Sequence, residues 1–438
     1  MSERRHEAER SATDPELAAA EGSQGGSREA PTPRGTLRLL TDRTVGSYFF
    51  AKVLASMGIW VHNIVAAVVV YEITGSALLV GTISVAQFTP QVFLAPWMGA
   101  IADRGNRRMQ TVLGRGLAGL GSGSLAVWLA MVGVDGLQSA WPIIGSALVV
   151  GLGFAVSAPA MHALVPSMAR PEELSSVVAI TTSPFTFARA AGPALGAILF
   201  VTGGPVLAFA VAGSAQLVYS LVVAWMPLRR VPRPAAKDRS MLGGLRHLRR
   251  DVSVGLLLLS VVAAGFGVDP VITLTPAIAD AFGEGEELVA MMASAFGLGA
   301  AITVLTFGPV RRRVSQPRLG SGGLLVLAGS MLALGVSPTP AAALVTLFIG
   351  GMGMMAAVTA LTTQIQERVP EELRARLMAL WAIAFVGSRP LAASIHGAIA
   401  DIVSPEAALG FLAVLITVIV LITRPAALQR ATERAVAP

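Results

Sequence analysis

The feature that most constrains this fold is a series of long apolar stretches, each able to cross a lipid bilayer as a helix. Crossing the hydrocarbon core takes about 20 mostly apolar residues. Only 13% of the 438 residues are charged, whereas a soluble domain carries about a quarter. We therefore predict an all-α membrane protein with twelve transmembrane helices, at residues 46–72, 77–101, 109–132, 140–162, 176–201, 205–227, 252–279, 288–310, 319–336, 341–363, 376–401 and 406–423.

The segments outside these stretches are short. Residues 1–43 lack apolar periodicity and are predicted to be a disordered cytoplasmic tail. No apolar core follows their basic start, which argues against a cleavable signal peptide. The remaining chain divides into two six-helix halves, a linker and a second tail, at 44–228, 252–424, 229–251 and 425–438. Because the chain has no cysteine, disulfides and thiolate metal sites are excluded.

Basic residues predict the orientation in the membrane. All but three of the 33 Lys and Arg residues fall in the tails and in alternate connections, counting Arg115 with the connection between spans two and three. The exceptions are Lys52, Arg189 and Arg389, which lie inside spans. The positive-inside rule then places both termini in the cytoplasm of a multi-pass protein of the inner (plasma) membrane. No basic, aromatic-bearing surface domain is present to bind nucleic acid.

The two halves are similar to each other. Matching features are Pro-Glu-Glu-Leu at 171–174 and 370–373, Arg189 and Arg389, and Gly-Ala-Ile at 196–198 and 397–399. Proline followed by acids suits the first turn of a helix, so each Pro-Glu-Glu-Leu is predicted to begin a span. Six spans per half give the parallel-repeat arrangement of transporters whose binding site lies between the halves.

The connection between spans two and three carries a motif. The stretch "GAIADRGNRR" (99–108) resembles the loop signature of the major facilitator superfamily, with Gly99, Asp103, Arg104, Arg107 and Arg108 at the matching positions. In that superfamily the Asp and its Arg neighbours make contacts across the halves that form and break during transport. A plain positive-inside loop is the alternative.

Two further stretches point to export. "ITGSALLVGTISVAQFTPQVFLAPWMGAIADR" is similar to the branch that contains enterobactin exporters and macrolide-efflux proteins. "AGPALGA" is similar to the antiporter motif of span five in proton-driven exporters, with Gly192, Pro193 and Gly196 at the motif positions.

Ionisable side chains at membrane depth are costly and are therefore candidates for function. Asp269 is a candidate proton carrier, and Pro270 beside it predicts a local break in span seven. The alternative for Asp269 is a structural partner of a buried arginine. Arg189 and Arg389 either bind an anionic substrate or Asp269, or cap carbonyls at helix breaks. Glu72, near the outer end of span one, is a weaker proton-coupling candidate.

Polar side chains also line up at helical spacing. Span one aligns Lys52, Ser56 and Asn63, with His62 next to them, and span two aligns Ser84, Gln87 and Gln91. We expect both stripes to line the substrate pathway. His62 is a third proton-coupling candidate, although a lone histidine more often serves packing; His162 and His396 are weaker candidates.

These features favour a secondary active exporter of a small amphipathic molecule, siderophore or drug-like, working by proton antiport between two rocking halves. An importer or facilitator on the same fold is the alternative. An enzyme is disfavoured: the only lysines, Lys52 and Lys237, follow alanine and so exclude a Walker A loop. The expected partners are the bilayer and a small molecule. No metal or cofactor is expected beyond the proton gradient, and the chain is expected to act as a monomer.

Overall fold

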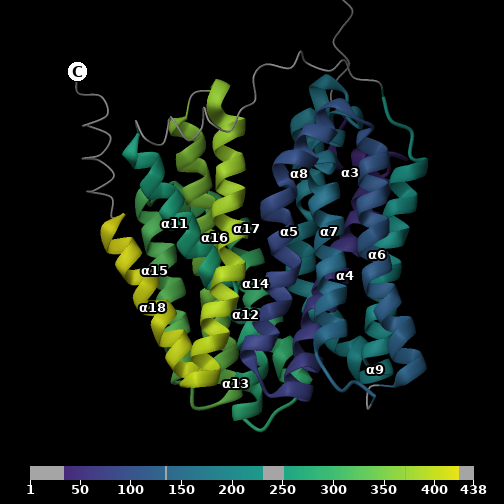
Figure 1. The fold of residues 1–438 in the computed structure, drawn as a ribbon. Helices are drawn as coiled ribbons and strands as arrows, with labels where there is room; N and C mark the ends of the chain where they lie inside the picture. Colours follow the sequence, from purple (N-terminus) through teal and green to yellow (C-terminus); the bar gives the residue numbers. More distant parts are fainter. Residues whose placement is uncertain (1–33, 134–135, 230–250, 370, 424–438) are drawn as a thin grey trace, which may run out of the picture.

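A computed structural model of the chain describes residues 34–133, 136–229, 251–369 and 371–423 (Figure 1). Every regular element in these ranges is a helix, and eleven helical segments are long and apolar enough to cross a membrane. In the first half the long helices are α4 Val45–Thr74, α5 Ala77–Arg104, α6 Arg107–Val132, α7 Trp141–Leu164, and α8 Leu174–Thr182 continuing into α9 Pro184–Trp225. In the second half they are α11 Val252–Val268 continuing into α12 Pro270–Thr273 and α13 Thr275–Ala281, then α14 Glu286–Arg311, α15 Gln316–Gly335, α16 Pro340–Arg368, α17 Glu371–Ile402 and α18 Pro405–Ile422.

Helix α9 crosses the bundle in two passages. Its backbone leaves helical geometry at Gly204, where φ is 67°. A Cβ atom on Gly192 would lie 2.5 Å from Trp60 Cβ, and one on Gly58 would lie 3.1 Å from the Ala212 carbonyl oxygen. Gly192 and Ala212 would be about 30 Å apart in a straight helix, yet both pack on the same part of α4. The chain therefore reverses at Gly204, and the predicted twelve passages are confirmed.

The helices form two groups that lie side by side (Figure 1). One contains α4 to α9 and the other α11 to α18. Helices α4 and α11 both begin at the upper end of the view, which we call the tail end; the connection after α4 lies at the opposite end. The first Pro-Glu-Glu-Leu segment lies at a helix start as predicted, as the 3₁₀ turn η2 (Pro171–Glu173) before α8, and Glu371 of the second segment begins α17.

Residues 34–43, which the sequence analysis included in the disordered tail, are folded. They contain a short helix, α3 (Thr36–Leu40), whose Leu39 is completely buried. The prediction missed this segment because α3 has too few residues to show apolar periodicity. Residues 1–33, most of the linker and the second tail lie outside the described residues.

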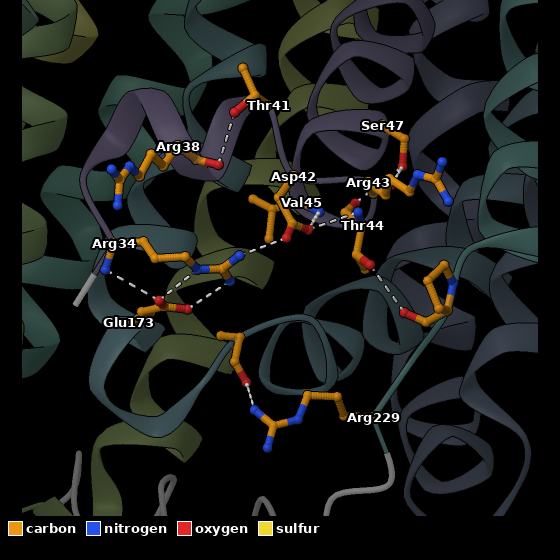
Figure 2. A network of polar contacts seen from close by, with 12 residues as sticks. Arg34, Arg38, Thr41, Asp42, Arg43, Thr44, Val45, Ser47, Glu173 and Arg229 are labelled. Atoms are coloured by element: carbon orange, nitrogen blue, oxygen red, sulfur yellow. Dashed lines mark hydrogen bonds and ion pairs between the residues drawn. The ribbon is translucent and has the colours of Figure 1, made fainter. Parts of the chain in front are cut away.

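Ion pairs hold this segment at the tail end (Figure 2). Arg34 donates to both carboxylate oxygens of Glu173 at 2.8 and 2.9 Å, and to Asp42 at 2.7 Å. Asp42 in turn accepts the backbone N–H groups of Thr44 and Val45 at 2.8 and 3.1 Å, which caps α4. The Arg34 guanidinium lowers the pKa of Glu173 from 4.5 to about 2. We call Arg34, Asp42 and Glu173 the N-terminal clasp.

Candidate functional site

The site begins at a break in the seventh passage. Helix α11 ends at Val268 and α12 begins at Pro270, so Asp269 lies at the junction. Proline has no N–H group to continue the helix and displaces the preceding turn. The break predicted from Pro270 is present.

Asp269 is completely buried beside a histidine of α17. Its Oδ2 atom accepts a hydrogen bond from Thr273 Oγ1 at 2.8 Å and lies 3.7 Å from His396 Nδ1. Among the described residues, Asp269 Oδ1 and both ring nitrogens of His396 have no hydrogen-bond partner. A nitrogen–oxygen distance of 3.7 Å exceeds a hydrogen bond. The two side chains therefore form a loose buried pair with unused bonding capacity.

Arg389 lies on the same helix as His396 and reaches into the first half. Its guanidinium carbon is 3.9 Å from the centre of the Phe88 ring, which belongs to α5. Its Nε and Nη2 atoms have no hydrogen-bond partner in the described part of the chain.

Arg189 occupies the matching place on α9 and reaches into the second half. It is 5% exposed, and its guanidinium carbon lies 5.1 Å from the Phe296 ring centre and 5.9 Å from that of Trp60. Its one polar contact with the described residues is a 4.0 Å approach of Nη1 to the sulfur of Met354. Nε and Nη2 have no partner within the described ranges.

The structure thus places the two predicted arginines and the predicted aspartate between the halves. Asp269 bonds Thr273, which lies against Gly81 of α5, and each arginine stacks on a phenylalanine of the other half. The sequence left open that Arg189 caps backbone carbonyl groups, but among the described residues it donates no hydrogen bond to a carbonyl oxygen. We call Asp269, His396, Arg189 and Arg389 the central cluster. In the described ranges, no group of three or more His, Asp or Glu side chains is placed to hold a metal ion.

The stripe on α4 has mixed surroundings. Lys52 donates to the carbonyl oxygen of Thr181 at 2.6 Å and lies 5.6 Å from the Tyr48 ring centre. It therefore caps the end of α8 near the bend before Pro184. Ser56 is half-buried, and the buried Asn63 has an Oδ1 atom without a partner among the described residues.

Among the described residues, neither His62 nor Glu72 makes a hydrogen bond to the central cluster. His62 Nδ1 is 3.0 Å from Ser122 Oγ, and its ring meets Phe209 edge-on inside the first half. This environment favours a packing role. Glu72 is exposed near the end of α4. On α5, Gln87 is buried, and Gln91 donates weakly to the Gln87 carbonyl at 3.4 Å.

The arginines of the "GAIADRGNRR" motif tie helix ends together. Arg107 donates to the carbonyl oxygens of Ala102 and Ala163, both at 3.1 Å, at the ends of α5 and α7. Arg108 donates to those of Ala224 and Met226 at 3.2 and 2.6 Å, at the end of α9. Positive charge is favourable where helix carbonyls lack partners. Asp103 and Arg104 lie in the last turn of α5, and Gly99 is half-buried one turn earlier.

The second motif brings two helices into close contact. A side chain at Gly192 would collide with Trp60, and one at Gly196 would touch Val61 Cα at 3.4 Å. Pro193 is buried between them inside α9. These positions let α9 pack directly on α4, next to Arg189 in the same helix.

Sequence reasoning misassigned Arg115. It was counted with a basic connection, but it is 6% exposed inside the first half on α6. Its Nη1 atom donates to Gln216 Oε1 at 3.1 Å, its other nitrogens contact the Met161 sulfur, and its guanidinium carbon lies 4.1 Å from the Phe154 ring centre. Its position eight residues inside α6, between Gly114 and Gly116, was the signal that it lies within the helix.

Sequence reasoning also missed Asp401, which joins the halves at the opposite end. From the last turn of α17 its carboxylate accepts hydrogen bonds from Ser76 Oγ and from the Ala77 and Leu78 N–H groups, at 2.5, 2.7 and 3.2 Å. Those three residues form the start of α5. The contact links helices more than 300 positions apart, so no local pattern reveals it.

Comparison with known proteins decides the family. Residues 35–438 match the profile of the family described as transmembrane secretion effector. The chain belongs to this family of the major facilitator superfamily. The resemblance inferred from the sequence is therefore confirmed, and the protein is a multi-pass membrane transporter.

Its curated relatives include enterobactin exporters. Enterobactin exporter EntS of Shigella boydii serotype 4 (strain Sb227) is 27% identical over 398 residues, covering 88% of this chain and 92% of the relative. EntS of Escherichia coli O81 (strain ED1a) gives the same values. Among solved structures, a D-xylose–proton symporter has a TM-score of 0.71 at 14% identity and covers 87% of this chain and 97% of its own. A bacterial homologue of the iron transporter ferroportin has a TM-score of 0.66 at 15% identity, covering 92% and 100%.

Membership of the major facilitator superfamily gives the central cluster a context. In transporters built from two parallel repeats, the substrate site lies between the repeats near the middle of the membrane. Arg189 lies midway along the fifth passage, and Arg389 lies midway along the eleventh. The cluster is therefore at the depth and in the interface where such sites occur.

Proposed function

We propose that this transporter is a secondary active exporter of a small amphipathic molecule, siderophore or drug-like, which it exchanges for protons by alternating access. The observation that carries the proposal is the central cluster between the halves, which contains a buried carboxylate and two guanidinium groups whose Nε and Nη2 atoms are buried and unpaired among the described residues. Export is supported by the 27% identity to enterobactin exporters.

Proton coupling is assigned to Asp269. A carboxylate inside a membrane bundle is retained only when something compensates it. Asp269 accepts one hydrogen bond from a neutral donor, Thr273, and its Oδ1 atom has no hydrogen-bond partner among the described residues. When ionised, it accepts hydrogen bonds from hydroxyl or amino groups of a cargo. A proton removes that acceptor, so proton and cargo compete, as antiport requires.

The arginines set the cargo class. Guanidinium groups stack on aromatic faces and donate to oxygen acceptors. Arg189 and Arg389 are each held against aromatic rings, with Nε and Nη2 unpaired within the described part of the chain. A molecule with aromatic rings and oxygen acceptors fits both tendencies.

The orientation follows from charge. The tail end carries the motif arginines Arg107 and Arg108 and the N-terminal clasp. The positive-inside rule assigns this end to the cytoplasm and the opposite end to the outside of the inner membrane. We take the working unit to be one chain.

Everted membrane vesicles test export and its driving force. With enterobactin as the first cargo, we expect accumulation inside energised vesicles containing the protein and none in vesicles without it. Nigericin, which collapses only the pH gradient, should abolish accumulation. Valinomycin, which collapses only the potential, should slow it less. Accumulation that withstands nigericin and valinomycin together would rule out proton antiport, and entry that only equilibrates across the membrane would leave a facilitator.

The Asp269→Asn substitution tests the carrier. The amide keeps the size of the side chain but cannot take up a proton. We expect cargo binding to the purified protein to become independent of pH, because the site no longer exchanges a proton, and accumulation against the pH gradient to be lost. Glu284→Gln, which changes an exposed acid between α13 and α14, serves as the matched control and should transport normally. Normal antiport by Asp269→Asn would remove this residue from the mechanism.

A further inference from the structure

The contact made by Asp401 has the form of a helix cap supplied by the other half of the molecule. The first N–H groups of a helix have no partner within it, and a carboxylate satisfies them and the positive end of the helix dipole. Asp401 accepts two such groups of α5 together with the Ser76 hydroxyl. It is thus a trans cap that joins α17 to α5.

Asp401 is unfavourably placed for its own helix. It is the penultimate residue of α17, where the dipole disfavours negative charge. The Asp401 carboxylate therefore stabilises only α5. That helix also has its own cap, because Ser76 Oγ accepts the Leu79 N–H at 3.1 Å. The trans cap can therefore be released without unwinding the start of α5.

The backbones around this cap are in close contact. A Cβ atom on Gly81 would lie 2.5 Å from the Ala393 carbonyl oxygen, and one on Gly397 would lie 2.7 Å from the Ala77 carbonyl oxygen. Two helices of different halves thus touch without intervening side chains. Asp401 lies at the exposed rim of this contact.

We propose that Asp401 is a gating residue that holds the end opposite the tails closed and releases α5 each time that end opens. This inference rests on the proposed alternating access, because only moving halves need to break the contact. Closure is the sum of the backbone contact, which excludes the cargo, and the trans cap, which biases the equilibrium toward the closed arrangement. Asp401 touches no cargo and acts by positioning α5 against α17.

Cysteine labelling measures the opening directly, since the chain has no cysteine of its own. Ala393→Cys places a thiol at a fully buried position of this contact. In right-side-out vesicles, a membrane-impermeant maleimide should label it slowly. We expect Asp401→Ala to speed labelling about three- to tenfold, the range of a lost helix cap. Asp401→Asn should have a smaller effect, because an amide still caps.

Asp280→Ala is the matched control, since it removes another exposed acid at the same end. It should leave the labelling rate unchanged. Equal rates in the Asp401→Ala and unmodified backgrounds would overturn the proposal, as would equal acceleration by Asp280→Ala.

A second measurement separates gating from simple loosening. Spin labels at Arg170→Cys and Arg313→Cys, one exposed position in each half at the tail end, report the distance between the halves there. If Asp401→Ala shifts the balance of a rocking molecule, opening one end shortens this distance at the other. A destabilised protein would broaden or lengthen it, which would overturn the proposal. If the distance responds as expected but no cargo is exported, the gate stands and the proposed export fails.

Discussion

Arginine side chains inside the first half and at the interface between the halves differ in their hydrogen-bond partners. Arg115 is 6% exposed, and its nitrogens are occupied by Gln216 and Met161. Arg189 is 5% exposed, yet two of its three guanidinium nitrogens have no partner among the described residues, and the same two atoms of Arg389 are also unpaired. Arg115 and Arg189 are therefore equally buried, but the nitrogen atoms of Arg115 have partners and most of those of Arg189 do not.

This difference distinguishes a structural arginine from one with nitrogen atoms available to bind a ligand. A buried polar group without a partner costs free energy, so it persists where something outside the chain compensates it. All the contacts of Arg115 come from one half. Arg189 and Arg389 each contact the other half, so the proposed movement of the halves would change their surroundings.

The largest expected effect is on transport, at the interface. Arg189→Gln and Arg389→Gln remove the charge proposed to bind the cargo, and we expect each to lower the transport rate about 100-fold, as losing a charged contact to a ligand does. Stability should hold or rise, because an uncompensated buried charge is removed. Vesicle accumulation and the unfolding temperature measure the two effects. A stability loss that matched the transport loss would make these arginines structural.

Arg115→Lys sharpens the comparison from the other side. Lysine keeps the charge but cannot stack on Phe154 or reach both Gln216 and Met161. We expect a loss of about 2–3 kcal/mol in stability, typical of a disrupted buried polar network, with transport per folded molecule nearly unchanged. The same substitution at Arg389 should leave stability unchanged and weaken transport. If Arg115→Lys and Arg389→Lys behaved alike, the distinction between the two regions would fail.

The sequence predicts the passages well because each is a local property. Apolar runs of sufficient length, the Pro-Glu-Glu-Leu starts and the break beside Asp269 can all be identified within a few residues. The depth of Arg189 and Arg389 also follows from counting along a helix. Their stacking on phenylalanines of the other half was not predicted, because the distance between helices of different halves depends on packing.

The misses share a physical cause. Arg115 was assigned to a connection because charge near a span end is usually solvated, and its partners Met161 and Gln216 come from two later helices. For Lys52 the sequence predicted a place on the pathway but not the hydrogen bond of its ammonium group to the Thr181 carbonyl oxygen. Asp401 was not identified as a candidate, because an acid at the end of a predicted helix carries no local signal. In each case the deciding partner lies far away in sequence.

The N-terminal clasp supplies a third kind of arginine, paired with carboxylates near water. Arg34 is about a quarter exposed, and its partner Glu173 is almost completely buried. Water screens such a pair, so it contributes less than the network around Arg115. The clasp joins the segment before α4 to the start of the fifth passage within one half. We therefore expect it to affect stability and not the alternation of the halves.

The smallest expected effect is at this clasp and depends on pH. The folded-state pKa of Glu173 is lowered to about 2 from an ordinary 4.5 by Arg34. Its stabilisation is therefore fully present above about pH 4.5 and is lost as pH falls toward 2. Glu173→Gln should cost about 1–2 kcal/mol at pH 7, the range of a charge-assisted pair that is partly screened. The gap between the unfolding temperatures of this variant and the unmodified protein should narrow as pH drops through that window. A gap that stays constant from pH 7 to pH 3 would mean that the ion pair does not hold the segment, leaving the burial of Leu39 as its anchor.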